Sequence, residues 1–350
     1  MLESEPIGSI PRPQALIDAM TAGNTEPGLM EELYDDALRD TIARFEATGS
    51  PVITDGEQTK SSFVTYPLDG LDTLAPGGAV IPFADGHARQ LPQLVHGPFR
   101  YGHFADDFLT NALSIASVPV KQPVIAVSAL SLLYPGNGID GYSKEQFLAD
   151  LVAEGVSDIR RCLDAGAHRV QIDFTEGRLS LKLDPSGGVL KDFIALNNEV
   201  LGHFDDDERA KIGVHTCPGG DQDSTHSLDI DYSGLLPELF ALKAGSFFMQ
   251  LASESDRPRV LGIVKDHLPG NAKVFIGVTD PINPTVETAQ EVRDQILEAS
   301  DFIPPDQLGT CDDCGFSPFG DDISTSRDTA FAKISTRLEG TDLASQALGV

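Results

Sequence analysis

Apolar runs rich in β-forming residues alternate along the chain with longer stretches in which apolar residues recur at helical spacing. The runs are nearly continuous in hydrophobicity, which is typical of parallel strands that are covered on both faces. They predict strands at 6–9, 52–55, 124–128, 170–173, 212–215, 247–251, 274–279 and 308–310. The longer stretches predict helices at 30–48, 144–165, 188–201, 232–243, 286–299 and 327–338.

One predicted helix has a specific start signal, because Ser143 is followed three residues later by Gln146, the pattern of a capping box. The repeated alternation of strand and helix favours an α/β fold, a (β/α)8 TIM barrel, with residues 1–350 forming a single domain. Residues 71–111 interrupt the alternation and are rich in Pro, Gly and His. We predict an insertion there, after the second strand unit, with short strands at 94–96 and 99–103 that form a hairpin lid.

The charge of the chain restricts its partners. It has 54 acidic and 25 basic residues, a formal net charge of −29, and no basic run. Binding to a nucleic-acid backbone needs clustered Lys and Arg, so nucleic acid is excluded as a partner. No apolar run has the ~18 residues of a membrane helix, and the N-terminus lacks the pattern of a signal peptide. We therefore predict no membrane association and a cytoplasmic location, where the four cysteines stay reduced.

Candidate chemistry lies at the ends of the predicted strands, because the loops that follow them meet at one rim of a barrel. His215 and Cys217 are two residues apart at such an end, so their side chains point to the same face. An imidazole and a thiolate side by side are half of a zinc site. Cys314 follows the last predicted strand, across the barrel mouth, and would be a third ligand. The alternative is a half-buried histidine beside a core cysteine, since free cysteine is often buried.

Cys311 and Cys314 form a C-x-x-C motif, which indicates a redox pair, two thiol ligands of zinc, or a ligand Cys314 with Cys311 as a bystander, the interpretation that we favour. Asp312 and Asp313 lie between them and disfavour the redox interpretation, because neighbouring carboxylates raise the pKa of a thiol. The loop after the His-x-Cys pair carries His226 among polar residues. This histidine belongs either to a structural loop or to the catalytic machinery.

Five motifs occur in order along the chain, namely Gly8-Ser9-Ile10-Pro11-Arg12-Pro13, Asp55-Gly56-Glu57-Gln58, Gln171-Ile172-Asp173, His215-Thr216-Cys217 and Asp313-Cys314-Gly315. With these motifs the chain resembles the cobalamin-independent methionine synthase family, in its catalytic C-terminal barrel. The resemblance implies a zinc-dependent methyltransferase. In such an enzyme zinc binds the thiol of homocysteine as a thiolate, and the thiolate accepts a methyl group from a folate.

The resemblance assigns the metal ligands. His215, Cys217 and Cys314 match the family's His-x-Cys pair and the Cys of its Asp-Cys-Gly motif. The family's remaining ligand is a Glu at the end of the sixth strand, and the predicted strand 247–251 contains none. Glu254 follows a few residues later and is our candidate for this ligand.

The resemblance also assigns the substrate contacts. Ile7 and Ser9 match positions that hold the amino acid substrate, and Glu57 and Asp173 match the carboxylates that bind its ammonium group. Asp280 follows the seventh strand, where the family has a catalytic His. We predict Asp280, together with the histidine in the loop after the His-x-Cys pair, as catalytic residues.

The methyl donor is open between methyl-folate and methyl-corrinoid, because the family stacks its folate on a Trp and this chain has none. One alternative is zinc-dependent alkyl transfer to a different thiol, as in epoxide–thiol transferases. A second alternative is a non-catalytic zinc-binding barrel. Structural zinc sites are usually closed by four strong ligands, and the sequence supplies only three secure ones, which disfavours this second alternative.

Overall fold

Seven parallel strands form one curled sheet at the centre of the computed structural model, which describes residues 1–23, 26 and 28–350. All pairs within the sheet are parallel. The order across the sheet is β1 (Glu3–Ser4), β13 (Leu308–Cys311), β12 (Lys273–Gly277), β11 (Ser246–Met249), β8 (Ile212–Thr216), β7 (Arg169–Asp173) and β6 (Lys121–Ile125). Because all seven strands run the same way, their carboxyl ends meet at one edge of the sheet.

The predicted strand at 52–55 is reduced to a single parallel bridge between Ile53 and Val120, beside β6. The backbone N–H of Lys121 donates to the carbonyl of Ile53 at 2.8 Å. On the other side, the Thr54 hydroxyl donates to the carbonyl of Gly8 at 2.8 Å. This segment therefore lies between β6 and the chain that follows β1.

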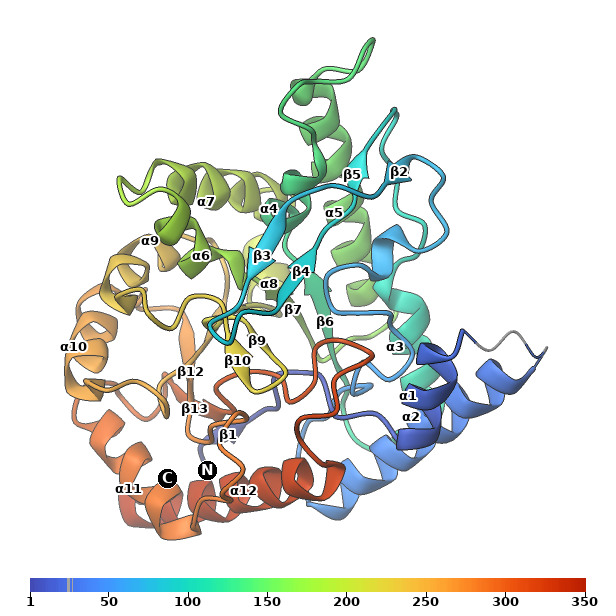
Figure 1. The fold of residues 1–350 in the computed structure, drawn as a ribbon. Coiled ribbons are helices and arrows are strands. Elements are labelled where there is room, and N and C mark those ends of the chain that lie inside the picture. The colour runs from blue at the N-terminus through green and yellow to red at the C-terminus, as the bar shows by residue number, and fades with distance from the viewer. Residues whose placement is uncertain (24–25, 27) are drawn as a thin grey trace.

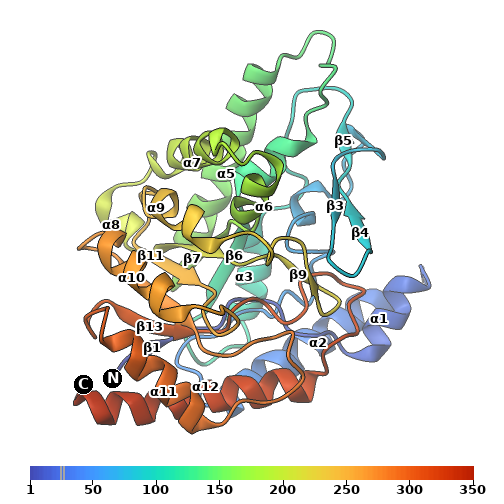
Figure 2. The ribbon, with the colours of Figure 1, turned by 60° about the vertical axis from the view of Figure 1, so that its left-hand side comes forward.

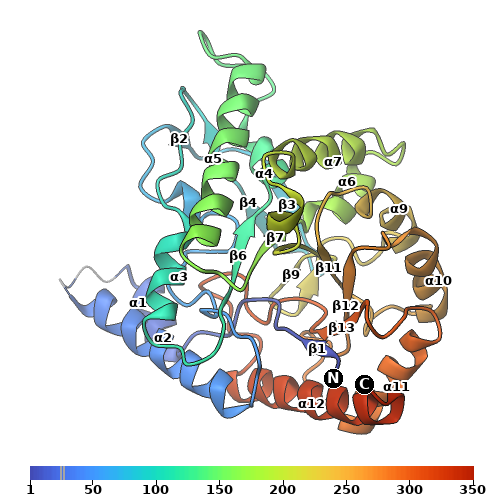
Figure 3. The ribbon, with the colours of Figure 1, turned by 180° about the vertical axis from the view of Figure 1, so that it is seen from behind.

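Helices surround the sheet on its outer side (Figure 3). The capping box that begins α5 is confirmed, since Ser143 and Gln146 each bond the other's backbone N–H. Buried apolar residues line the inner face of this helix, such as Phe147, Leu151 and Ile159. The helices are α1 (Gln14–Thr21), α2 (Leu29–Ala47), α3 (Ala105–Leu113), α4 (Val127–Leu130), α5 (Lys144–Asp164), α6 (Glu176–Leu183), α7 (Gly188–Leu201), α8 (Asp206–Arg209), α9 (Leu236–Leu239), α10 (Arg257–His267), α11 (Ala289–Ser300) and α12 (Arg327–Leu348).

The segment predicted as an insertion forms two short antiparallel ribbons, β2 (Leu74–Ala75) with β5 (Gln93–Leu94) and β3 (Val80–Pro82) with β4 (Ala88–Gln90). The β3–β4 hairpin reaches towards a second small ribbon, β9 (Gly220–Asp221) with β10 (Ser224–Thr225) (Figures 1 and 2). Ala84 in the hairpin turn donates its backbone N–H to the carbonyl of Thr225 at 3.0 Å. Arg89 forms an ion pair with the buried carboxylate of Asp221. The hairpin is therefore fastened to the loop that follows β8.

Several predicted boundaries were wrong. The first strand is Glu3–Ser4 rather than 6–9, because Pro6 has no N–H to donate to a ladder. The predicted helix 232–243 is interrupted, with a 3₁₀ turn at Tyr232–Gly234 followed by α9, and Pro237 stands in the first turn of α9. The predicted strand at 99–103 is irregular chain that leads into α3. Over the described part of the chain, no helix is both long and apolar enough to span a membrane.

Candidate active site

One imidazole nitrogen and two thiol sulfurs, all potential metal ligands, meet at the carboxyl edge of the sheet. His215 lies near the end of β8, Cys217 follows the same strand, and Cys314 follows β13. The nearest imidazole nitrogen and the two sulfur atoms all lie within 4.8 Å of one another. The two sulfurs are 2.9 Å apart. The fold therefore brings together residues that are almost a hundred positions apart in sequence.

The hydrogen bonding of His215 leaves one nitrogen available as a ligand. Its Nδ1 lies 3.3 Å from the backbone carbonyl of Phe248 in β11. A carbonyl only accepts, so Nδ1 carries the proton of the neutral ring and Nε2 presents a lone pair. Nε2 is buried and has no hydrogen-bond partner among the described residues. Metal-ligating histidines are commonly oriented by such a bond from the second ring nitrogen.

The two thiols of the cluster differ in acidity. The hydrogen bond from Cys217, and then the neighbouring His215, lower the pKa of the Cys314 thiol well below its ordinary value. Burial raises the pKa of the Cys217 thiol. Of the two thiols, Cys314 therefore ionises more easily, and a cation between the sulfurs would also stabilise the thiolate of Cys217. One imidazole nitrogen with two sulfurs is a donor set that zinc selects, so the residues fit a zinc ion.

A small pocket lies directly beside this cluster, and we call it the thiol pocket. Its wall includes His215 and Cys314, and it also contains the four residues that the family resemblance assigns to the substrate, Ile7, Ser9, Glu57 and Asp173. The Ser9 hydroxyl oxygen accepts from the backbone N–H of Ser317 at 3.2 Å, which leaves its proton free to donate. The structure therefore brings the predicted substrate contacts to the predicted metal ligands.

The loop that carries Glu57 has an unusual backbone. Glu57 has φ of 55°, in the left-handed region that non-glycine residues rarely adopt. The guanidinium of Arg12 is buried and donates to the carbonyls of Glu57 and Lys60, both at 2.7 Å. Asp55 accepts the Glu57 backbone N–H at 3.0 Å. Such strain is common at functional sites, and here these bonds hold the carboxylate in the pocket.

The carboxyl groups of Glu57 and Asp173 are both buried, and that of Glu57 is incompletely paired. Glu57 Oε2 has no hydrogen-bond partner among the described residues, and Oε1 is 3.9 Å from the Lys60 ammonium. Burial raises the pKa of Glu57 to about 8, and burial also raises the pKa of Asp173. Gln171 donates to Asp173 Oδ1 at 2.7 Å. A cationic ligand would favour the ionised form of both groups, so the pocket suits an ammonium group.

Glu254 lies outside the group of three ligand atoms in the described structure. Its Oε1 accepts from Arg178 at 2.7 Å and from the side chain of Gln250 at 3.0 Å. Gln250 is buried directly after β11, and its backbone N–H points to the carbonyl of Thr216. Glu254 is therefore paired with the Arg178 guanidinium and is not among the three ligand atoms that the structure brings together.

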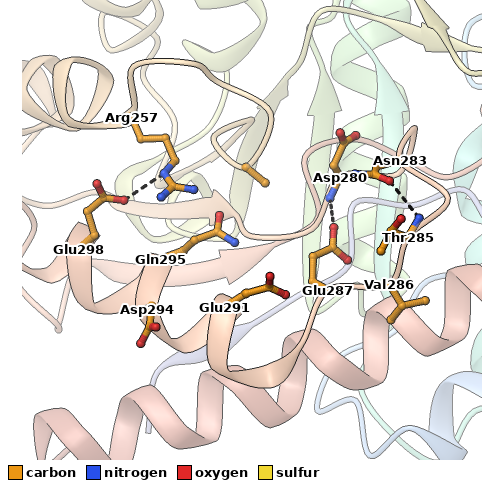
Figure 4. Close-up of a pocket in the computed structure, with 11 residues that line it drawn as sticks. Arg257, Asp280, Asn283, Thr285, Val286, Glu287, Glu291, Asp294, Gln295 and Glu298 are labelled. Atoms are coloured by element: carbon orange, nitrogen blue, oxygen red, sulfur yellow. Dashed lines mark hydrogen bonds and ion pairs between the residues drawn. The ribbon is translucent and has the colours of Figure 1, made fainter.

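Asp280 lines a separate open pocket, in which five of the eleven lining residues are acidic, and it lies near Asn283 and Glu287 (Figure 4). Its backbone N–H donates to Glu287 at 2.8 Å. The thiol pocket shares none of the residues that line this open pocket. The structure therefore places Asp280 apart from the proposed metal ligands.

His226 lies closer to the cluster, in the wall of a pocket next to the thiol pocket. Its Nδ1 is hydrogen-bonded to the hydroxyl of Ser227, and its ring packs edge-on against Phe83 of the hairpin. Burial lowers the pKa of His226 to about 4, so its ring is neutral near pH 7.

One organising residue was missed by the sequence reasoning. The carboxylate of Asp313 is buried and accepts four hydrogen bonds from the loop after β11. The donors are the backbone N–H groups of Leu251, Ala252 and Ser253, and the Ser253 hydroxyl. A Cβ atom at Gly277 would lie 1.9 Å from Asp313 Oδ1, so only glycine fits there. In the sequence, only the position of Asp313 directly before the predicted ligand Cys314 indicated that it could have a role in the site.

Comparison with known proteins adds an independent line of support. The profile of the family described as "Cobalamin-independent synthase, Catalytic domain" matches residues 4–327. A protein named methionine synthase from Saccharolobus solfataricus is 25% identical, with 99% of this chain and 96% of that protein covered. Another from Sulfurisphaera tokodaii is 23% identical, with coverage of 99% and 94%.

Solved structures share the fold. A B12-independent methionine synthase from Shewanella sp. W3-18-1, in complex with selenomethionine, superposes with a TM-score of 0.78. It is 18% identical, and 99% of each chain is covered. A putative vitamin-B12 independent methionine synthase from Listeria monocytogenes has a TM-score of 0.69 and 20% identity, with coverage of 97% of this chain and 99% of that one.

A parallel α/β sheet carries a His-Cys-Cys cluster beside a pocket lined by two carboxyl groups. The match over residues 4–327 identifies the reaction class as methyl transfer. The chain belongs to the cobalamin-independent synthase family, and the resemblance found in its motifs is confirmed.

Proposed function

We propose that the protein transfers a methyl group to the thiol of homocysteine and so produces methionine. The observation that carries the proposal is the shared pocket. One imidazole nitrogen and two thiol sulfurs line it or adjoin it, and two buried carboxyl groups line the same space. Homocysteine has one thiol and one ammonium group, and each of these groups matches one side of the pocket.

His215, Cys217 and Cys314 would hold a zinc ion, with Glu254 as the predicted further ligand. Zinc bound there supplies a Lewis acid that lowers the pKa of a substrate thiol and keeps its sulfur nucleophilic near pH 7. Glu254 would have to leave Arg178 to reach the cluster, since the two are paired at 2.7 Å. While Glu254 stays paired, three protein ligands leave a position for the substrate sulfur.

The residues of the thiol pocket would orient the substrate. Glu57 and Asp173 would bind the ammonium group as carboxylates, and Glu57 would lose its proton when the cation arrives. Ile7 and Ser9 would contact the rest of the amino acid, with the Ser9 hydroxyl as a donor to its carboxylate. Two carboxyl groups favour an amino acid thiol over a thiol without an ammonium group.

Asp280 and His226 remain predicted catalytic residues, Asp280 at the carboxyl edge of the sheet and His226 beside the thiol pocket.

We also propose that the sheet is a closed (β/α)8 barrel in which the segment around Ile53 takes the eighth position, and that residues 1–350 form one domain with an insertion at about 71–111. The bridge from Ile53 to Val120 supports this closure. The methyl donor would be methyl-folate or methyl-corrinoid.

Metal content of single variants tests the ligand set. His215→Ala, Cys217→Ala and Cys314→Ala should each lose most of the bound zinc. Cys311→Ala is the matched control, because this thiol belongs to the same C-x-x-C motif but donates to the Phe275 carbonyl, outside the cluster. Full zinc retention in all three ligand variants would refute the proposed site. Methionine formation from homocysteine with methyl-folate and with methyl-corrinoid then tests the reaction, and failure with both donors would refute it.

A further inference from the structure

A buried lysine lies directly behind one of the carboxyl groups proposed to bind the ammonium group of the substrate. The side chain of Lys60 is 1% exposed, and its Nζ is 3.9 Å from Glu57 Oε1. Lys60 does not line the thiol pocket. A cation at this position repels an ammonium group in the pocket, and burying it is costly, so its presence needs a physical reason.

The contacts of the lysine hold its charge back from Glu57. The Nζ atom donates to the backbone carbonyl of Pro123 at 2.9 Å. It also faces the rings of Tyr66 and Phe108, at 4.7 and 5.6 Å from their centroids, where a cation is attracted to the ring face. The 3.9 Å to Glu57 is longer than an N–H···O hydrogen bond of about 2.7–3.2 Å. Lys60 therefore attracts the charge of Glu57 without occupying its oxygens.

The aromatic support of the lysine is itself fixed by neighbouring elements. Tyr66 is fully buried, and its hydroxyl donates to Asp158 Oδ2 of α5 at 2.5 Å. The other oxygen of Asp158 accepts the backbone N–H of Ala105, at the start of α3, at 2.6 Å. Phe108 of α3 packs edge-on against Tyr66, with 5.8 Å between the ring centroids. A movement of the ammonium towards Glu57 would lengthen its contacts with this rigid support.

The charged groups around Glu57 show what the lysine contributes. Burial raises the pKa of Glu57 to about 8, and Lys60 is the strongest influence that opposes this rise. The other charged groups that act on Glu57 are Asp173, Asp55 and the guanidinium of Arg12. Asp158 acts on Lys60 from the side away from the pocket. Without Lys60, Arg12 would be the one cation among three acidic groups, and Glu57 would hold its proton more firmly.

We propose that Lys60 is a positioning residue that supports the negative charge of Glu57 while leaving its oxygens free, and that it thereby makes the thiol pocket select a thiol that carries an ammonium group. This inference rests on the proposed function and names a residue that determines its substrate specificity. Glu57 without the lysine would offer a neutral acid to the ligand. With the lysine 3.9 Å away, Glu57 ionises when the ligand arrives.

The sign of the effect follows from the order of the charges. The carboxyl group of Glu57 lies between Lys60 and the pocket, so Lys60 is nearer to this carboxylate than to the ammonium group of a bound ligand. Attraction therefore exceeds repulsion, and the lysine favours the bound pair of carboxylate and ammonium. Each unit by which the pKa of Glu57 rises costs a factor of about ten in affinity at a pH below that pKa.

The test uses Lys60→Met, which removes the charge and keeps the length of the side chain. The Pro123 carbonyl keeps a partner in this variant, because the Gln122 side chain also donates to it at 3.2 Å. Calorimetric titration of zinc-loaded protein at pH 7 compares homocysteine with 4-mercaptobutyrate, which lacks the ammonium group. Homocysteine affinity should fall about tenfold, and 4-mercaptobutyrate affinity should stay within about twofold. Lys144→Met, at an exposed position of α5, is the matched control and should change neither affinity.

A double-mutant cycle separates this role from a merely structural one. In the Glu57→Gln protein, Lys60→Met should cause no further loss of homocysteine affinity, because the lysine then only repels the ammonium group. A residue that only supports the fold would cost the same in both backgrounds. Lys60→Gln is a second neutral variant, whose amide can still donate to the Pro123 carbonyl, and it should behave as Lys60→Met does.

The pH dependence supplies a further readout. The loss of homocysteine affinity in Lys60→Met should shrink as the pH rises from 7 to 9. Wild-type Glu57 has a pKa of about 8 and gains little from a further rise above it, whereas the variant continues to gain as its more firmly protonated Glu57 ionises. A purely structural loss would not change in this way.

Four results would overturn the proposal. They are unchanged homocysteine affinity in both neutral variants, an equal loss for the two ligands, the same loss in the Glu57→Gln background, and a loss that is constant between pH 7 and 9. Failure of the proposed function is distinguishable from these. In that case homocysteine would add no sulfur ligand to the zinc of the wild-type protein, whatever Lys60 does.

Discussion

Replacing Asp313 with asparagine removes one acceptor oxygen and keeps the shape of the side chain. Each carboxylate oxygen accepts two hydrogen bonds, one from Leu251 and Ala252 and the other from Ser253. An amide keeps one acceptor oxygen, so two of these four donors lose their partner whichever way the amide turns. Burial raises the pKa of Asp313 to about 7, so the group is ionised at pH 8 and above. Hydrogen bonds to charged groups contribute about 1.5–3 kcal/mol each, and at such a pH we expect a loss of about 3 kcal/mol in the free energy of unfolding.

This loss converts to a melting temperature. The entropy of unfolding is about 2.1 cal/mol/K per residue, or about 0.7 kcal/mol/K for 350 residues, so Tm should fall by about 4 °C. Calorimetry of wild-type and variant protein at equal zinc content measures this shift. Asp294→Asn is the control, because Asp294 is exposed on α11, and it should change Tm by less than about 1 °C. A fall below about 1 °C for Asp313→Asn as well would refute the assigned role of this carboxylate.

Three further predictions follow from carboxyl groups whose pKa is raised by burial. Glu57→Gln should weaken homocysteine binding about thirtyfold, through loss of about 2 kcal/mol of binding free energy. The affinity for 4-mercaptobutyrate, which lacks the ammonium group, should not change, and calorimetric titration with both ligands checks this. Homocysteine binding should release protons below about pH 8, because Glu57 is protonated in the empty pocket, and titration in buffers of different ionisation enthalpy measures the number. Glu176→Gln should raise Tm at pH 8 more than at pH 5. The pKa of Glu176 in the folded protein is about 8, above the ordinary 4.5, so the stability of the wild-type protein falls as the pH rises from 4.5 to 8. The variant lacks this fall because glutamine does not titrate. Equal Tm differences at the two pH values would contradict the last prediction.

The core of the site could be predicted from the sequence because it depends on local rules. A strand of alternating side chains places His215 and Cys217 on one face, and parallel strands end at one edge. These two rules bring Cys314 to the pair, and the two sulfurs are indeed 2.9 Å apart. The capping box at Ser143 is equally local, since its bonds join residues three positions apart.

Features that depend on contacts between distant segments could not be predicted in the same way. Asp313 accepts from a loop about sixty positions earlier, and nothing in the composition of either segment indicates the pairing. Glu254, in the loop between β11 and α10, is held by Arg178 on α6. The hairpin contact through Arg89 and Asp221 likewise joins residues 132 positions apart. Ion pairs of this kind are set by the fold, so they become visible only once the fold is known.

X-ray absorption at the zinc edge, with and without homocysteine, tests the central claim most directly. The claim is that His215, Cys217 and Cys314 hold a zinc ion with a position for the sulfur of the substrate. The spectrum of the zinc-loaded protein should show two sulfur ligands and at least one nitrogen ligand, and homocysteine should add one sulfur. A first coordination shell that homocysteine leaves unchanged, or one without two sulfur ligands at the start, would contradict the account.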